Sequence, residues 1–133
     1  MKAVLCKELG LPGKLVIEQV PALRAAKGQI VVSVKACGVN FPDTLIIQGK
    51  YQFKPELPFS PGGEVAGVVK EVGEGVTNPK PGDRVIAFNT WGGFAEEMVV
   101  DADRTVPMPK EMEFVPAAAL VLTYGTSYHA LKD

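Results

Sequence analysis

The chain has 133 residues, of which 47% are hydrophobic, and its formal net charge at pH 7 is −1. A chain of this length and composition predicts one globular domain with a core of its own. Its acids and bases are interspersed, which excludes the basic surface typical of proteins that bind nucleic acid or anionic lipid. We therefore expect neutral or small partners.

The N-terminal residues predict a strand rather than a targeting segment, because they lack the long apolar run of a signal peptide. No stretch of the sequence approaches the roughly 20 apolar residues of a membrane-spanning helix. The two cysteines, Cys6 and Cys37, lie far apart in apolar, strand-like settings. This pattern is typical of reduced thiols in a cytosolic protein, and a disulfide between them is the less favoured alternative. We expect a cytoplasmic location and no membrane partner.

Short β-branched runs separated by 14 glycines and 11 prolines predict a mainly antiparallel sheet with many turns. The expected strands are residues 2–7, 15–20, 29–38, 64–72, 84–87, 94–100 and 104–107. In residues 29–38, every second residue from Ile30 to Ala36 is apolar. The intervening positions hold Val31, Ser33 and Lys35, so this strand is predicted to be half-buried with one apolar face.

Two segments have a helical pattern instead. Apolar residues recur at helical spacing from Phe41 to Ile47, with Asn40 placed to cap the helix and Pro42 in its first turn. Residues 113–122, rich in alanine and leucine, predict a second helix, and a third is expected to start after Gly125. No stop signal ends this third helix, so we expect that further sequence follows.

Two functional patterns are too weak to accept. Residues 72–76 contain two glycines but lack the third glycine of a dinucleotide-binding turn, and Pro79 and Pro81 stand where a helix should begin. One histidine, His129, and two separate cysteines cannot form a closed four-ligand metal site. We expect turns in the first case and no metal centre in the second.

Four motifs follow one another along the chain. Residues 37–43 read Cys-Gly-Val-Asn-Phe-Pro-Asp, and residues 61–67 read Pro-Gly-Gly-Glu-Val-Ala-Gly. They are followed by Val-Gly-Glu-Gly-Val at 72–76 and Lys-Pro-Gly-Asp-Arg-Val at 80–85. Together they resemble the medium-chain dehydrogenase/reductase superfamily, in its zinc-free quinone oxidoreductase branch, over nearly the whole chain.

This resemblance implies a mainly β fold, a partly open chaperonin-10-like (GroES-like) barrel with short helices. Residues 1–122 would form the catalytic domain, and residues 123–133 would begin a connecting helix toward a Rossmann domain that this chain lacks. Zinc members of the superfamily have a cysteine and a histidine where this chain has Asn40 and Gly63. An amide and a glycine cannot supply those ligands, so no zinc is expected. The resemblance also implies NADPH or NADH as the cofactor.

The resemblance also implies roles for several residues. Asn40 would lie against the nicotinamide and ribose or the substrate oxygen, while its side-chain oxygen caps the helix. Thr126 would contact the nicotinamide carboxamide, although a Gly-Thr-Ser turn is also an ordinary helix cap. Tyr51 matches the proton donor of 2-enoyl thioester reductases and forms an aromatic pair with Phe53. Catalysis is therefore expected from Asn40 and Tyr51.

Other residues are expected to shape the acceptor site. At Ile47 the family commonly has an arginine, so the mouth should be more apolar and should favour a bulky hydrophobic acceptor over a phosphate-bearing one. Trp91 is interpreted either as a wall of that site or as a core aromatic residue. Asp43 and Glu64 are expected to be buried acids with structural roles.

The resulting expectation is the catalytic-domain portion of an NAD(P)H-dependent quinone or enone oxidoreductase, inactive alone and homodimeric at full length. Two alternatives stay open. One is a 2-enoyl thioester reductase of the same superfamily, suggested by the Tyr51 segment. The other is a non-enzymatic, co-chaperonin-like binding or assembly module, because the glycine pattern of residues 72–85 also occurs in that fold.

Overall fold

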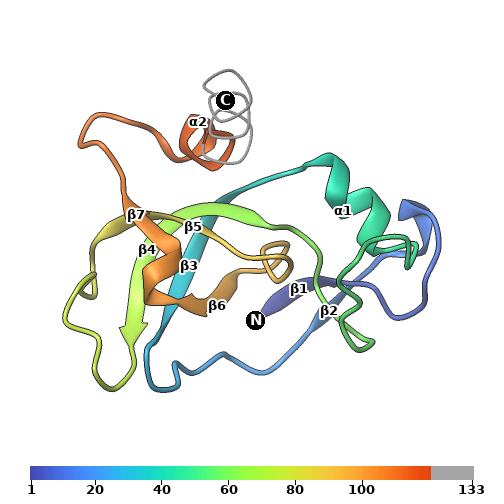
Figure 1. The fold of residues 1–133 in the computed structure, drawn as a ribbon, viewed down its shortest axis with the longest axis horizontal. Helices are drawn as coiled ribbons and strands as arrows, with labels where there is room; N and C mark the ends of the chain where they lie inside the picture. Colours follow the sequence, from blue (N-terminus) through green and yellow to red (C-terminus); the bar gives the residue numbers. More distant parts are fainter. Residues whose placement is uncertain (121–133) are drawn as a thin grey trace.

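The computed structural model describes residues 1–120, which form two antiparallel sheets and a few short helices (Figure 1). The first sheet contains β1 (Lys2–Leu5) and β2 (Val16–Gln19). The second has the order β6-β3-β4-β5-β7, with β3 at Gln29–Gly38, β4 at Glu64–Val72, β5 at Arg84–Phe88, β6 at Glu97–Asp101 and β7 at Thr105–Pro107. The sheets are open, as expected for a partly open barrel.

The helices are short. They are α1 (Phe41–Ile46), α2 (Phe114–Ala118) and the 3-10 turns η1 (Pro12–Lys14) and η2 (Ala102–Arg104). Within residues 1–120, no helix is long and apolar enough to span a membrane. The domain boundary expected at residue 122 and the third helix lie outside the described residues.

The main core is built from residues of β3, β4, β5 and β6, namely Ile30, Val32, Val65, Val69, Val85, Ala87, Met98 and Val100. The expectation that β3 is half-buried is wrong for its first residues, since Val31 is as completely buried as Ile30 and Val32. Val31 pairs with Glu71 on β4, so the two side chains point to the same face of the sheet. The segment between β2 and β3, residues 20–28, is bonded to that face and covers it. We call this segment the strap.

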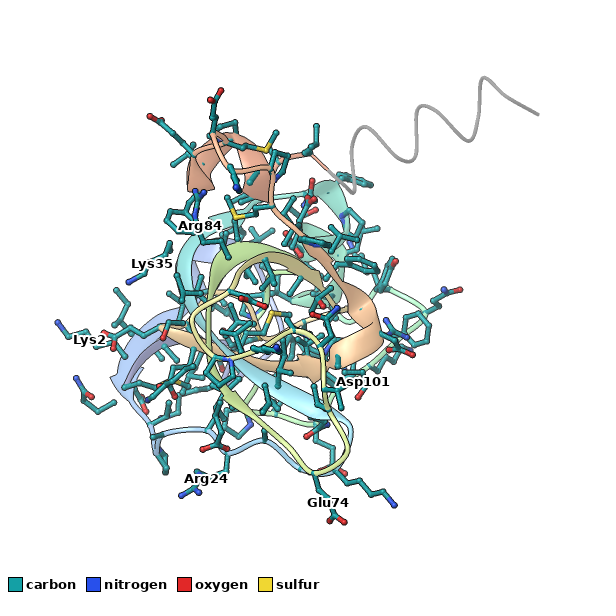
Figure 2. The ribbon with its side chains drawn as sticks, turned by 90° about the vertical axis from the view of Figure 1, so that its left-hand side faces the viewer. Lys2, Arg24, Lys35, Glu74, Arg84 and Asp101 are labelled. Atoms are coloured by element: carbon teal, nitrogen blue, oxygen red, sulfur yellow. The ribbon has the colours of Figure 1, made fainter. Side chains whose placement is uncertain are left out.

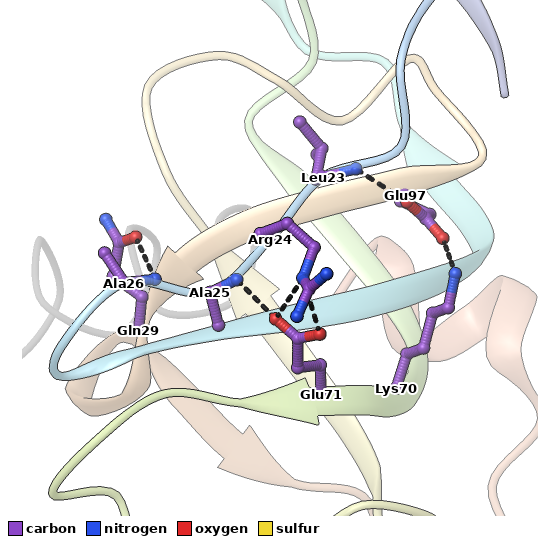
Figure 3. Close-up of polar contacts among 8 residues, drawn as sticks. All are labelled: Leu23, Arg24, Ala25, Ala26, Gln29, Lys70, Glu71 and Glu97. Carbon is purple, nitrogen blue, oxygen red and sulfur yellow. Dashed lines mark hydrogen bonds and ion pairs between the residues drawn. The ribbon is translucent and has the colours of Figure 1, made fainter.

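Two carboxylates hold the strap on the sheet (Figure 3). Glu71 accepts a hydrogen bond of 2.6 Å from the backbone N–H of Ala25, and Arg24 pairs with the same carboxylate. Glu97, on β6, accepts a hydrogen bond of 3.1 Å from the backbone N–H of Leu23 and forms an ion pair with Lys70. These bonds satisfy strap N–H groups that lie outside any strand ladder.

The expected strand at residues 94–100 begins later, at Glu97. The backbone N–H of Phe94 donates to Pro61 O at 2.8 Å, and Ala95 forms an isolated bridge with Ala3 on β1. Residues 94–96 therefore connect the large sheet to β1, while the Glu96 carbonyl still accepts a hydrogen bond of 2.8 Å from the Val34 N–H of β3.

The hairpin β1–β2 and helix α1 share a separate hydrophobic cluster of Cys6, Ile46, Ile47 and Phe59, with Leu15, Tyr51 and Trp91 packed against it. Cys6 and Cys37 are free thiols. Because α1 packs on this cluster, its N-terminus is held beside the edge of the large sheet.

Helix α2 packs on β3 and β4, and Gly38 makes this approach feasible. A Cβ on Gly38 would lie 2.7 Å from the carbonyl oxygen of Ala118. Arg84 fixes the segment that leads to α2 by donating to the carbonyls of Lys110 and Met112 and by stacking 4.7 Å from the Phe114 ring centroid. Figure 2 shows Arg84 beside this helix, while Lys2, Lys35 and Glu74 project outward at the periphery.

We predict that acid weakens the attachment of the strap through Glu97. The ion pair with Lys70 and the hydrogen bond from Leu23 lower the pKa of the Glu97 carboxyl despite its burial. The stabilisation is therefore complete above the usual glutamate pKa of about 4.3 and is lost as pH falls through the lower folded-state value. Glu97→Gln should reduce the free energy of unfolding at pH 7 by about 1–3 kcal/mol. At pH 3, the free energies of unfolding of Glu97→Gln and the parent protein, measured in urea, should differ by less than they do at pH 7.

Glu96→Gln is the matched control, because the Glu96 side chain is exposed and makes no hydrogen bond or ion pair within residues 1–120. A Glu97→Gln protein as stable as the Glu96→Gln protein at pH 7 would contradict this role for Glu97.

Candidate functional site

Three strand ends meet at one edge of the large sheet. Gly38 at the end of β3 pairs with Glu64 at the start of β4, and Glu64 pairs with Phe88 at the end of β5. Antiparallel pairing thus places the residues just beyond each end, including Asn40, Gly63 and Asn89, in one neighbourhood.

A cleft of about 200 Å³ opens at this edge. It is lined by Asn40, Pro42, Asp43, Tyr51, Gly63, Phe88, Asn89, Thr90 and Arg104. A larger cavity of about 510 Å³ lies around residues 78–85 and 102–110, and none of the predicted site residues lines it. The smaller cleft, which unites Asn40 and Tyr51, is therefore the candidate site.

Asn40 is the N-cap residue of α1, with an extended backbone at φ −123° and ψ 162°, and it forms a capping box with Asp43. The Asn40 backbone N–H donates to Asp43 Oδ2 at 2.8 Å, and the Asp43 N–H donates to the Asn40 carbonyl at 3.0 Å. Asp43 also accepts a hydrogen bond from the backbone of Gly62. Burial raises the pKa of the Asp43 carboxyl, while both backbone bonds lower it. Asp43 thus has the structural role that the sequence predicts, since it fixes the Asn40 backbone.

The side-chain amide of Asn40 has an unused donor. Its Nδ2 atom is buried and has no hydrogen-bond partner within residues 1–120. Leaving a buried donor unsatisfied costs about 1–3 kcal/mol, which a native fold retains only where something else uses the group. A ligand oxygen in the cleft would satisfy this amide.

Tyr51 is half-buried in the loop after α1, and its ring packs on the α1 cluster while lining the cleft. Phe53 lies next to it, with ring centroids 6.0 Å apart, but is 49% exposed and does not line the cleft. Of the predicted site residues, the structure therefore brings Asn40 and Tyr51 together.

The other predicted residues lie elsewhere. Ile47 is only 3% exposed and belongs to the cluster beneath α1. Trp91 lines a neighbouring cavity of about 240 Å³ beside β1, which shares only Asn89 with the cleft. Thr126 lies outside the described residues.

The cleft also includes residues that the sequence did not single out, namely Phe88, Asn89, Thr90 and Arg104. The first three follow from the β4–β5 register, which no local pattern reveals. Arg104 comes from η2, at the start of β7, whose residue Thr105 pairs with Ala87.

Cys37, at the end of β3, is a thiol in an apolar setting. Burial raises the pKa of Cys37 to about 12. At neutral pH it is therefore protonated, which does not suit a nucleophile.

Gly63 stands where a zinc member of the superfamily has its histidine, and the structure leaves no room for one. A Cβ at Gly63 would lie 2.7 Å from the carbonyl oxygen of Asn89. No group of three or more His, Cys, Asp and Glu residues within residues 1–120 could hold a metal ion. Among residues 1–120, the lining of the cleft contains no cysteine or histidine that could serve as a zinc ligand.

We predict that Gly63→Ala is destabilising, because the added methyl group must displace the Asn89 carbonyl. The free energy of unfolding should fall by about 1–3 kcal/mol, as for other overpacked positions. Gly13→Ala is the control, since a Cβ at Gly13 meets nothing within 4 Å. Urea unfolding measures both. Equal stability of the two variants would contradict the prediction, because the Asn89 carbonyl would then move aside at no cost in free energy.

The sequence of this chain is similar to a known domain family and to several curated proteins. Residues 26–110 match the family described as alcohol dehydrogenase GroES-like domain. The quinone oxidoreductase-like protein 2 homolog of Nematostella vectensis is 46% identical over 133 residues, which cover 98% of this chain and 36% of that protein. The synaptic vesicle membrane protein VAT-1 homolog of Rattus norvegicus is 45% identical over 122 residues, which cover 90% of this chain and 30% of that protein.

Among solved structures, the Escherichia coli quinone oxidoreductase complexed with NADPH is similar, with a TM-score of 0.91 and 32% identity. The match covers 100% of this chain and 41% of that one. The chain thus spans well under half the length of these relatives.

Proposed function

Because the chain belongs to the alcohol dehydrogenase GroES-like domain family, within the medium-chain dehydrogenase/reductase superfamily, we propose that it is the catalytic-domain portion of an NADPH-dependent reductase of quinones or enones. The superfamily assignment makes it part of an oxidoreductase. We base the proposed acceptor and cofactor on the similar proteins, one of which is a quinone oxidoreductase complexed with NADPH.

The buried Asn40 amide without a partner carries this proposal. Together with Tyr51, it provides two hydrogen-bond donors in one small cleft. When a quinone or enone accepts hydride, negative charge develops on its oxygen. Donors that are fixed in advance at that oxygen stabilise the charge without any reorganisation in the transition state.

NADPH, when bound, supplies the hydride. Asn40 Nδ2 donates a hydrogen bond to the acceptor oxygen, and the capping box with Asp43 keeps the Asn40 backbone in place. The Tyr51 hydroxyl gives its proton to that oxygen and regains one from solvent. Phe88 and Pro42 in the cleft wall reduce the access of water, which strengthens both interactions.

Zinc independence is part of the proposal. It is supported by the amide at Asn40 and by the close approach of Asn89 to Gly63. Without a Lewis acid, Asn40 and Tyr51 must stabilise the developing negative charge by hydrogen bonding.

Other predicted residues would serve the complete protein. Thr126 would contact the nicotinamide. Phe53 would extend the apolar wall beside Tyr51, and Trp91 would contact the acceptor only if the acceptor reached past Asn89. Alone, this chain would not turn over, because it covers only 30–41% of the length of the similar proteins.

A 2-enoyl thioester reductase is the second candidate, since Tyr51, the residue matched to the proton donor of those enzymes, does line the cleft. Comparing the complete protein's kcat/KM for a crotonyl thioester with that for a naphthoquinone separates the two. A co-chaperonin-like module is not favoured, since similar proteins are named as quinone oxidoreductases or as their relatives.

We predict that Tyr51→Phe and Asn40→Ala each lower kcat for quinone reduction by about 100- to 1000-fold in the full-length protein, because each removes one side-chain donor at the charged oxygen. Asn40→Ala keeps the hydrogen bonds between Asn40 and Asp43, because these use only the backbone N–H and carbonyl of Asn40. Steady-state NADPH oxidation measures the rate, and thermal unfolding confirms that both variants are folded. Turnover within threefold of the parent would reject the role of the residue concerned.

A further inference from the structure

Arg104 is a cation at the candidate site that no other residue within 1–120 engages. It lines the cleft together with Asn40 and Tyr51, yet it is exposed. Its guanidinium forms no ion pair or hydrogen bond in the described part of the chain, where the four ion pairs use other residues. A guanidinium offers five N–H donors in a planar fork that matches carboxylate and related oxyanions.

The acids near Arg104 in sequence do not neutralise it inside the cleft. Asp101 and Asp103 line another cavity, of about 470 Å³, whereas Arg104 lines the cleft. In the 3-10 turn η2, successive side chains point about 120° apart, so Asp103 and Arg104 lie on different sides. Neither acid is among the residues that line the cleft.

Only two other ionisable side chains line the cleft in the described part of the chain, Asp43 and Tyr51. Asp43 is 6% exposed, and its carboxylate accepts hydrogen bonds from the backbones of Asn40 and Gly62. Since Asp43 is buried in these bonds, Arg104 dominates the charge that an entering molecule meets.

We propose that Arg104 binds an oxyanion substituent of the acceptor, such as a carboxylate or sulfonate, and makes the cleft selective for anionic quinones or enones. This inference rests on the proposed function and deepens it. It also revises the expectation drawn from Ile47. The arginine common at that position is absent, but η2 supplies a guanidinium from a different segment.

The test compares two acceptors in the full-length protein, 1,2-naphthoquinone and 1,2-naphthoquinone-4-sulfonate. The quantity measured is the ratio of kcat/KM for the sulfonate to kcat/KM for the neutral quinone. Comparing this ratio between proteins cancels the different intrinsic reactivity of the two acceptors. Arg104→Gln should lower the ratio by about five- to tenfold, the effect of one partly exposed charge-assisted hydrogen bond. Arg104→Lys should give an intermediate ratio, because it keeps the charge and loses the fork.

Lys80→Gln is the matched control, with the same change of charge at an exposed residue that lines neither the cleft nor the cavity beside β1. It should leave the ratio unchanged. A decrease of less than threefold for Arg104→Gln, or an equal decrease for Lys80→Gln, overturns the proposal. A change in the KM for NADPH without a change in the ratio also overturns it, because Arg104 would then bind the cofactor.

A second measurement separates this inference from the proposed function. Titration of naphthalene-1-sulfonate, which cannot be reduced, is followed by NMR in the parent protein and in Arg104→Gln. Weaker binding to the variant supports the inference even if the parent fails to reduce the neutral quinone, a failure that would reject only the proposed function. Equal binding to both proteins overturns the inference.

Discussion

The site depends on the register of three antiparallel strands. Gly38 pairs with Glu64 and Glu64 pairs with Phe88, so the ends of β3 and β5 and the start of β4 lie at one edge. Glycine is needed at this edge because backbones approach closely there. A Cβ at Gly38 would meet the Ala118 carbonyl, and one at Gly63 would meet the Asn89 carbonyl, each at 2.7 Å. The missing side chains thus let α2 pack at the end of β3 and let the Asn89 backbone lie against Gly63.

Buried carboxylates in this chain mainly hold backbone segments. Asp43 binds N–H groups at the start of α1 and before β4, and Glu97 binds one in the strap. Such bonds satisfy donors that no strand or helix ladder reaches. Besides the Asp43 carboxylate, the cleft is lined by neutral donors on Asn40, Tyr51, Asn89 and Thr90 and by the cation of Arg104. In the proposed function, such donors would stabilise an oxygen that gains negative charge without the help of a metal ion.

The cleft, as far as this chain forms it, is one wall of a larger site in the proposed enzyme. The chain spans 36% of one similar protein and 41% of another. In the proposed enzyme, the residues described here would position the acceptor and stabilise charge on its oxygen. The chain is similar to proteins with different names, a quinone oxidoreductase-like protein and a vesicle membrane protein homolog.

Local patterns in the sequence determined the strands at 29–38 and 64–72, the start of α1 at Phe41 and the capping residue Asn40, because alternation and capping depend on neighbouring residues. Tertiary structure alone decided that Val31 is buried, since the strap comes from another segment. It also decided that Trp91 faces a different cavity and that Phe88 and Arg104 reach the cleft. These features depend on strand register between distant segments, and register is fixed by packing over the whole sheet rather than by any local run of residues.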